Sequence, residues 1–118
     1  MERKYLDKLT QWKNDNHRKP LIIKGARQVG KTWLMKEFAQ KEFTKWVYIN
    51  FEDNELAQHV FETDFDIQRI ILHLSIASQT TIDKDTLILF DELQEAPRGV
   101  TALKYFQEKN FKNNVITC

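Results

Sequence analysis

The sequence predicts an α/β fold with a parallel sheet that is covered by helices on both faces. Three short segments with the composition of strands, "LIIK", "WVYINF" and "TLILF", begin at residues 21, 46 and 86. Segments with helical spacing of apolar residues alternate with them, and a fourth strand-like run, "NVITC", occupies residues 114–118. Alternating strands and helices indicate parallel strands that are joined by helical crossovers.

Apolar residues recur at helical spacing between these strands. The first helix is predicted over residues 2–15 and is broken by "NHRKP", because a proline disfavours a helical residue before it. Its apolar face is formed by Tyr5, Leu6, Leu9 and Trp12. Four further helices are predicted around the following groups: Leu34, Met35 and Phe38; Leu56 and Val60; Ile67, Ile70, Ile71, Leu74 and Ala77, with Asp66 as N-cap; and Val100, Leu103 and Phe106.

Length and composition predict one soluble domain. The 118 residues allow a single modest core, which we divide into an N-terminal helix (2–15) and a core region (20–118) within one domain, 1–118. The net charge of +1 gives no electrostatic indication of nucleic-acid or membrane binding. The sequence has no signal-like or membrane-spanning apolar stretch, and its single cysteine, Cys118, excludes an internal disulfide. These features fit a cytoplasmic protein.

The segment "GARQVGKT", residues 25–32, has the pattern of a phosphate-binding loop. It contains two of the three glycines of the chain and lies between a predicted strand and a predicted helix, the context in which this pattern binds nucleotide phosphates. Glycine allows the sharp turn and the close approach of backbone N–H groups, and the following helix directs its positive end at the same anion. Lys31 would reach the β- and γ-phosphates, and Thr32 would bind Mg²⁺. The predicted nucleotide-binding residues are Gly25, Ala26, Arg27, Gln28, Val29, Gly30, Lys31 and Thr32.

The third apolar strand ends in two carboxylates, Asp91 and Glu92. Burial of both in the core would be costly, so we expect them at the carboxyl end of the strand, where open α/β sheets bind ligands. Asp91 is then the predicted outer ligand of the Mg²⁺ held by Thr32. Glu92 is the predicted catalytic base for a water molecule, with Lys31 as its catalytic partner at the phosphates. A second acid beside the metal ligand favours hydrolysis over transfer to another acceptor. The alternative is a strand that runs into a solvated acidic loop.

Together, "KPLIIKGARQVGKTWLMKEFA", "VYINFE", "LILFDELQEAPR" and "ALKYFQE" resemble the amino-terminal ATPase domain of the AAA-type prokaryotic ATPases, within the AAA+ superfamily of P-loop NTPases. The resemblance covers residues 3–117. It implies a three-layer fold and a mostly parallel sheet of the additional-strand type, with the order 2-3-4-1 for the four strands present. It also implies ATP as the nucleotide, and the roles given above for Lys31, Thr32, Asp91 and Glu92.

The family pattern usually continues beyond "NVIT" with a serine-containing turn, a fifth strand, a helical lid and, in many members, a separate carboxyl-terminal domain of uncertain character. The sequence ends at Cys118, so the resemblance implies a partial domain without these elements or an arginine finger. We expect slow hydrolysis, because an arginine finger contributes about 10³- to 10⁵-fold to turnover. The fifth strand would normally cover residues 21–24. Without it, this strand becomes an apolar sheet edge, and we expect self-association.

Several residues have two interpretations. Arg27 is either part of the binding loop or a solvated charge, and Gln94 either positions the attacking water or begins a helix. The polar residues Asn50, Glu52 and Asp53 are interpreted as a charged loop, and the aromatic residues Tyr5 and Trp12 as core rather than as an adenine contact. Three functional readings follow: an ATP hydrolase, a nucleotide-binding switch or interaction module without significant turnover, and a poorly folding remnant that does neither.

Overall fold

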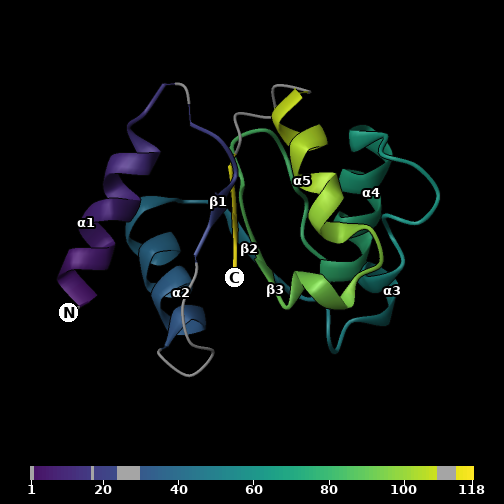
Figure 1. The fold of residues 1–118 in the computed structure, drawn as a ribbon, viewed down its shortest axis with the longest axis horizontal. Helices are drawn as coiled ribbons and strands as arrows, with labels where there is room; N and C mark the ends of the chain where they lie inside the picture. The colour runs from purple at the N-terminus through teal and green to yellow at the C-terminus, as the bar shows by residue number, and fades with distance from the viewer. Residues whose placement is uncertain (1, 17, 24–29, 109–113) are drawn as a thin grey trace.

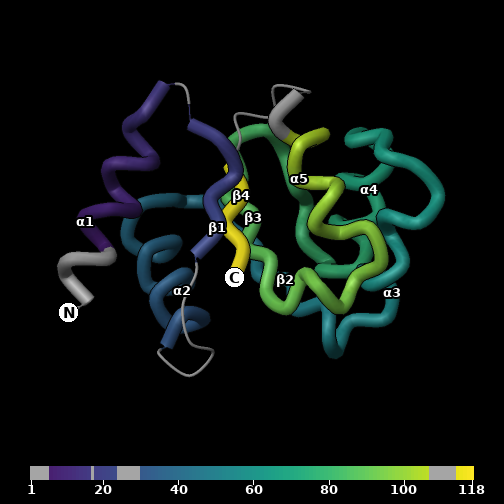
Figure 2. Tube along the Cα trace, viewed as in Figure 1, coloured from purple at the N-terminus to yellow at the C-terminus, as the bar shows by residue number. Residues whose placement is uncertain are grey.

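A four-stranded parallel sheet forms the centre of the molecule. The computed structural model describes residues 2–16, 18–23, 30–108 and 114–118. The strands are β1 (Leu21–Ile22), β2 (Trp46–Asn50), β3 (Leu87–Asp91) and β4 (Val115–Thr117). Their order is β1-β4-β3-β2, and each neighbouring pair is parallel, so β4 lies between β1 and β3 (Figure 2). This confirms the predicted α/β fold and the predicted strand order, read from the opposite edge of the sheet.

Helices cover both faces of this sheet, which gives three layers (Figure 1). The helices are α1 (Glu2–Lys13), α2 (Lys31–Glu42), α3 (Glu55–Gln58), α4 (Ile67–Ser78) and α5 (Gly99–Glu108), with a 3₁₀ turn, η1 (Leu93–Glu95). Helices α1 and α2 lie on one face, and α3, α4 and α5 on the other. Over the described part of the chain, no helix combines the length and apolar character required to cross a membrane.

Strand β3 divides the core into two clusters because successive side chains of a strand point to opposite faces. Leu87 and Leu89 pack with α1 and α2, whereas Ile88 and Phe90 pack with α3, α4 and α5. All five residues of β3 are buried. The apolar run before Asp91, which was predicted as a buried strand, therefore corresponds to the central part of the sheet.

Besides shifts of one residue at strand ends, the structure differs from the predicted elements in the following ways. The first helix ends at Lys13 rather than at residue 15, and β1 is shorter than "LIIK". Ile22 is 48% exposed because β1 is the edge strand of the described sheet. Around residues 56–60 the helix is a single turn, with Leu56 exposed. Val100 is also exposed, because the buried face of α5 is formed by the side chains of Ala102, Leu103 and Phe106.

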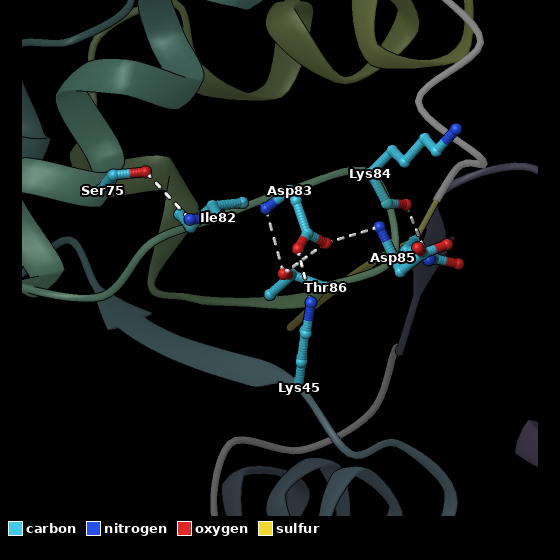
Figure 3. A network of polar contacts seen from close by, with 8 residues as sticks. Lys45, Ser75, Ile82, Asp83, Lys84, Asp85 and Thr86 are labelled. Carbon is cyan, nitrogen blue, oxygen red and sulfur yellow. Dashed lines mark hydrogen bonds and ion pairs between the residues drawn. The ribbon is translucent and has the colours of Figure 1, made fainter.

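A polar network fixes the amino ends of β2 and β3 (Figure 3). The Asp83 carboxylate accepts hydrogen bonds from Lys45 Nζ (2.7 Å), Asp85 N (2.9 Å) and Thr86 Oγ1 (3.1 Å). The backbone N–H of Leu87 then donates to the carbonyl of Lys45 (3.0 Å), which begins the β2–β3 ladder. The register continues from there to the opposite end of the pair, where Asn50 lies beside Asp91.

Candidate functional site at the carboxyl edge of the sheet

The carboxyl ends of the strands and the start of α2 enclose a pocket of about 410 Å³. It is lined by Lys31, Thr32, Asn50, Glu52, Asp91, Glu92 and Cys118. The two predicted parts of the site, the end of the "GARQVGKT" segment and the Asp91-Glu92 pair, are therefore brought together in one place. The other predicted loop residues, 25–29, lie outside the described residues.

Helix α2 begins at this pocket with an arrangement that suits an anion. Gly30 is its N-cap residue, with φ 77° and ψ 28°, a left-handed conformation that glycine adopts readily. Glycine has no side chain to cap the first turn, and that turn contains no acidic residue, but it does contain the cation of Lys31. The first-turn N–H groups, the positive end of the helix dipole and the lysine charge therefore all lie at this end of α2.

Asp91 is the centre of the polar contacts in the pocket. Its Oδ2 atom accepts hydrogen bonds of 2.6 Å from Thr32 Oγ1 on α2 and of 2.6 Å from Tyr48 OH on β2. Its Oδ1 atom has a weaker contact of 3.5 Å with the Cys118 thiol. The carboxylate is thus held by residues from three different segments of the chain. Asp91 is only 8% exposed, and these contacts explain how a carboxylate is tolerated there.

The protonation of this cluster follows from burial and hydrogen bonding. Burial raises the pKa of the Asp91 carboxyl, but the hydrogen bonds it accepts lower the pKa by more, so the net shift favours the ionised form. Burial and the hydrogen bond to Asp91 raise the pKa of the Tyr48 hydroxyl above its usual range. Burial, together with the nearby charge of Asp91, raises the pKa of the Cys118 thiol to about 12. At neutral pH the Asp91 anion therefore accepts hydrogen bonds from neutral donors.

Glu92 has an unusual backbone conformation. Its φ of 55° and ψ of 41° lie in the left-handed region, where a residue with a Cβ is disfavoured by about 1–2 kcal/mol. The chain turns there from β3 into η1, while the backbone N–H of Glu92 donates to the carbonyl of Cys118 (3.2 Å). Gln94 Nε2 donates to the Glu92 Oε1 atom at 3.1 Å. Non-glycine residues in this conformation are concentrated at functional sites, where the surrounding structure enforces it.

Sequence reasoning missed two residues of this cluster, Tyr48 and Cys118. Tyr48 pairs with Leu89 across the β2–β3 ladder, so Asp91, two residues after Leu89, lies diagonally across on the same face of the sheet. Only the register of two strands separated by about 40 residues reveals this relationship. Asn50 and Glu52, which the sequence analysis interpreted as loop residues, also line the pocket.

Comparison with known proteins identifies the family. The family model described as AAA domain matches residues 17–118, which is most of the chain. No curated protein and no solved structure gives a significant match. The chain belongs to the AAA domain family, as its sequence resemblance predicted. Membership implies an ATP-binding P-loop module.

Proposed function

We propose that this AAA domain protein binds ATP together with Mg²⁺ in the pocket at the carboxyl edge of the sheet and hydrolyses it to ADP and phosphate. The observation that carries the proposal is the hydrogen bond of 2.6 Å from Thr32 to Asp91. This bond joins Thr32, which follows the predicted phosphate-binding Lys31, to Asp91 at the end of β3. We further infer that residues 1–118 act as one nucleotide-binding domain, in which α1 packs on α2 through Leu9.

The phosphate groups of ATP would lie at the amino end of α2. Lys31 would contribute a charge-assisted hydrogen bond to the β- and γ-phosphate oxygens, and the first-turn N–H groups would contribute backbone donors. The predicted loop 25–29 would complete the cradle. The left-handed conformation of Gly30 supports this arrangement, because it starts the helix without a side chain beside the first-turn N–H groups.

Thr32 and Asp91 form a donor set that fits Mg²⁺. Both offer oxygen, and the pKa of Asp91 is shifted toward the charged form. Within the described residues, no group of three or more His, Cys, Asp or Glu side chains could hold a metal by itself. Mg²⁺ is commonly bound by one or two protein oxygens together with phosphates and water, so the pair matches this mode of binding. Bound Mg²⁺ would neutralise negative charge on the phosphate oxygens.

Glu92 would accept the proton of the attacking water. Its carboxylate lines the same pocket as Lys31 and Thr32, and its position directly after Asp91 places it beside the proposed metal site. The hydrogen bond from Gln94 to the Oε1 atom helps to orient the Glu92 carboxylate.

The same contact supports a second candidate function, a nucleotide-binding switch without significant turnover. A carboxylate oxygen that already accepts a hydrogen bond from an amide is less accessible to a water molecule. If the Gln94 contact persists with ATP bound, the pocket would bind nucleotide and hydrolyse it poorly.

Two measurements test these alternatives. Calorimetric titration with ATP, in Mg²⁺ and in a chelator, should detect binding that is tighter in Mg²⁺. Absence of binding in both conditions would contradict both candidate functions. A phosphate-release assay at saturating ATP then separates them, because steady release above the protein-free rate supports the hydrolase and binding without release supports the switch.

A further inference from the structure

Tyr48 is a hydrogen-bond partner of Asp91 that the proposed mechanism does not use. Its hydroxyl donates to Asp91 Oδ2 at 2.6 Å, the same distance as the bond from Thr32 to that oxygen. The Nδ2 atom of Asn50 lies 3.5 Å from the Tyr48 hydroxyl oxygen, so the residues at the end of β2 form a short chain of contacts that leads to Asp91.

We propose that Tyr48 is a positioning residue, which orients the Asp91 carboxylate toward the Mg²⁺ of bound ATP and thereby sets how strongly Mg²⁺ promotes ATP binding. This inference rests on the proposed function of the pocket. Partners that orient the ligands of a metal by hydrogen bonds typically contribute about 10- to 100-fold to metal affinity or activity.

The distribution of donors over the two carboxylate oxygens supports this role. Thr32 and Tyr48 both donate to Oδ2, so they fix the plane of the carboxylate from two sides. Oδ1 has the long contact with the Cys118 thiol, and the lone pairs of a carboxylate oxygen give it further capacity to bind a cation or a water of its shell. The Thr32 proton is directed at Asp91, so the Thr32 hydroxyl would present lone pairs rather than its proton to a cation.

The phenol ring itself is held in place. Tyr48 lies on β2 between the buried residues Val47 and Ile49, and its ring packs against the core cluster under α1 and α2. The Lys36 ammonium lies 4.0 Å from the centre of this ring. The hydroxyl therefore reaches Asp91 from a rigid strand rather than from a loop, which is the arrangement that a precisely oriented metal ligand requires.

Tyr48→Phe removes this hydroxyl and keeps the ring. We expect the ATP affinity in a chelator to equal that of the parent, and the gain in affinity on adding Mg²⁺ to fall by about tenfold or more. Tyr105→Phe is the matched control, because its ring stacks on Phe65 in the layer on the other face of the sheet. The Tyr105→Phe variant should keep the full gain in ATP affinity on adding Mg²⁺. Calorimetry with ATP in both conditions measures the two affinities.

Three outcomes would overturn the inference. An unchanged Mg²⁺ gain in Tyr48→Phe would mean that the hydroxyl does not position Asp91. An equal loss of affinity with and without Mg²⁺, as an unfolded or loosened variant would give, would mean that Tyr48 serves only the fold. If the ATP affinity of the parent chain does not respond to Mg²⁺, the proposed function itself is wrong. The parent is therefore measured with and without Mg²⁺ before any variant is compared.

A second background separates positioning from general stability. In Asp91→Asn, the metal ligand is already lost, so adding Tyr48→Phe should not reduce the remaining Mg²⁺ gain further. If the two substitutions reduce that gain independently, Tyr48 does not act through Asp91 and the proposal is wrong.

Discussion

The Thr32 hydroxyl donates a 2.6 Å hydrogen bond to Asp91, which connects the first turn of α2 with the last residue of β3 over 59 positions of sequence. The contact forms because β4 lies between β1 and β3, and because the carboxyl ends of parallel strands meet at one edge of the sheet. Several polar residues from distant segments therefore share one pocket.

The first prediction concerns Asp91→Asn. Asparagine keeps the size and an acceptor oxygen but lacks the charge that would hold Mg²⁺. ATP binding in a chelator should persist, while the Mg²⁺-dependent gain in affinity should fall by at least about tenfold. Calorimetry measures both values, and Asp53→Asn, an exposed carboxylate in the turn after β2, is the matched control. A full Mg²⁺ gain in Asp91→Asn would contradict the assignment of Asp91 to the metal.

The second prediction concerns Glu92→Gln. The amide still hydrogen-bonds a water molecule but cannot accept its proton, so ATP binding should remain and phosphate release should fall by about 10²-fold or more. Glu95→Gln, in the exposed part of η1, should release phosphate at the parent rate. Parent-like release by Glu92→Gln would show that Glu92 is only a strand-end charge.

The sequence predicted the fold well because its strands and helices carry strong local patterns. The buried run before Asp91 and the glycine pattern before Lys31 were sufficient to expect both parts of the site. The position of β4 between β1 and β3 followed from the family resemblance and not from local residues. The sequence also led us to expect Asp91 outside the core, whereas the structure buries it with compensating hydrogen bonds.

Other features depend on tertiary structure. The contact of Tyr48 with Asp91 requires the register of β2 against β3, and a strand tyrosine by itself suggests only packing. The left-handed backbone of Glu92 could not be predicted, because local preference opposes it for any residue except glycine. The turn from β3 into η1 enforces this conformation instead.

The third prediction concerns pH and the network that fixes the amino ends of β2 and β3. Its hydrogen bonds, led by the one from Lys45, lower the pKa of Asp83 to about 2 in the folded chain. The unfolded value is near 3.9, so the stabilisation is complete above about pH 4 and is lost as the pH falls toward the folded pKa. In a double-mutant cycle of Asp83→Asn and Lys45→Gln, the coupling free energy should therefore decline from about pH 4 toward pH 2. Urea unfolding followed by circular dichroism measures it, and a coupling that is constant over this range would contradict the account.

The fourth prediction concerns the β1 edge. Within the described sheet, β1 pairs with β4 alone, and Ile22 is 48% exposed beside the open edge. Apolar sheet edges recruit other strands, so we expect sedimentation to detect concentration-dependent association. Ile22→Lys should reduce the association, whereas Leu56→Lys, which changes an exposed apolar residue on α3, should not. If the parent sediments as a monomer at every concentration, the edge does not drive association.

Calorimetry tests whether the pocket binds the phosphates of ATP. ATP is titrated in Mg²⁺ into the parent and into the Lys31→Ala variant, and the two affinities are compared. The substitution removes the cation at the start of α2, and a hydrogen bond to a charged group contributes about 1.5–3 kcal/mol. We expect Lys31→Ala to bind ATP about 10- to 150-fold more weakly than the parent. Lys41→Ala, at the exposed other end of α2, should bind ATP like the parent. Parent-like ATP affinity in a folded Lys31→Ala variant would contradict the account.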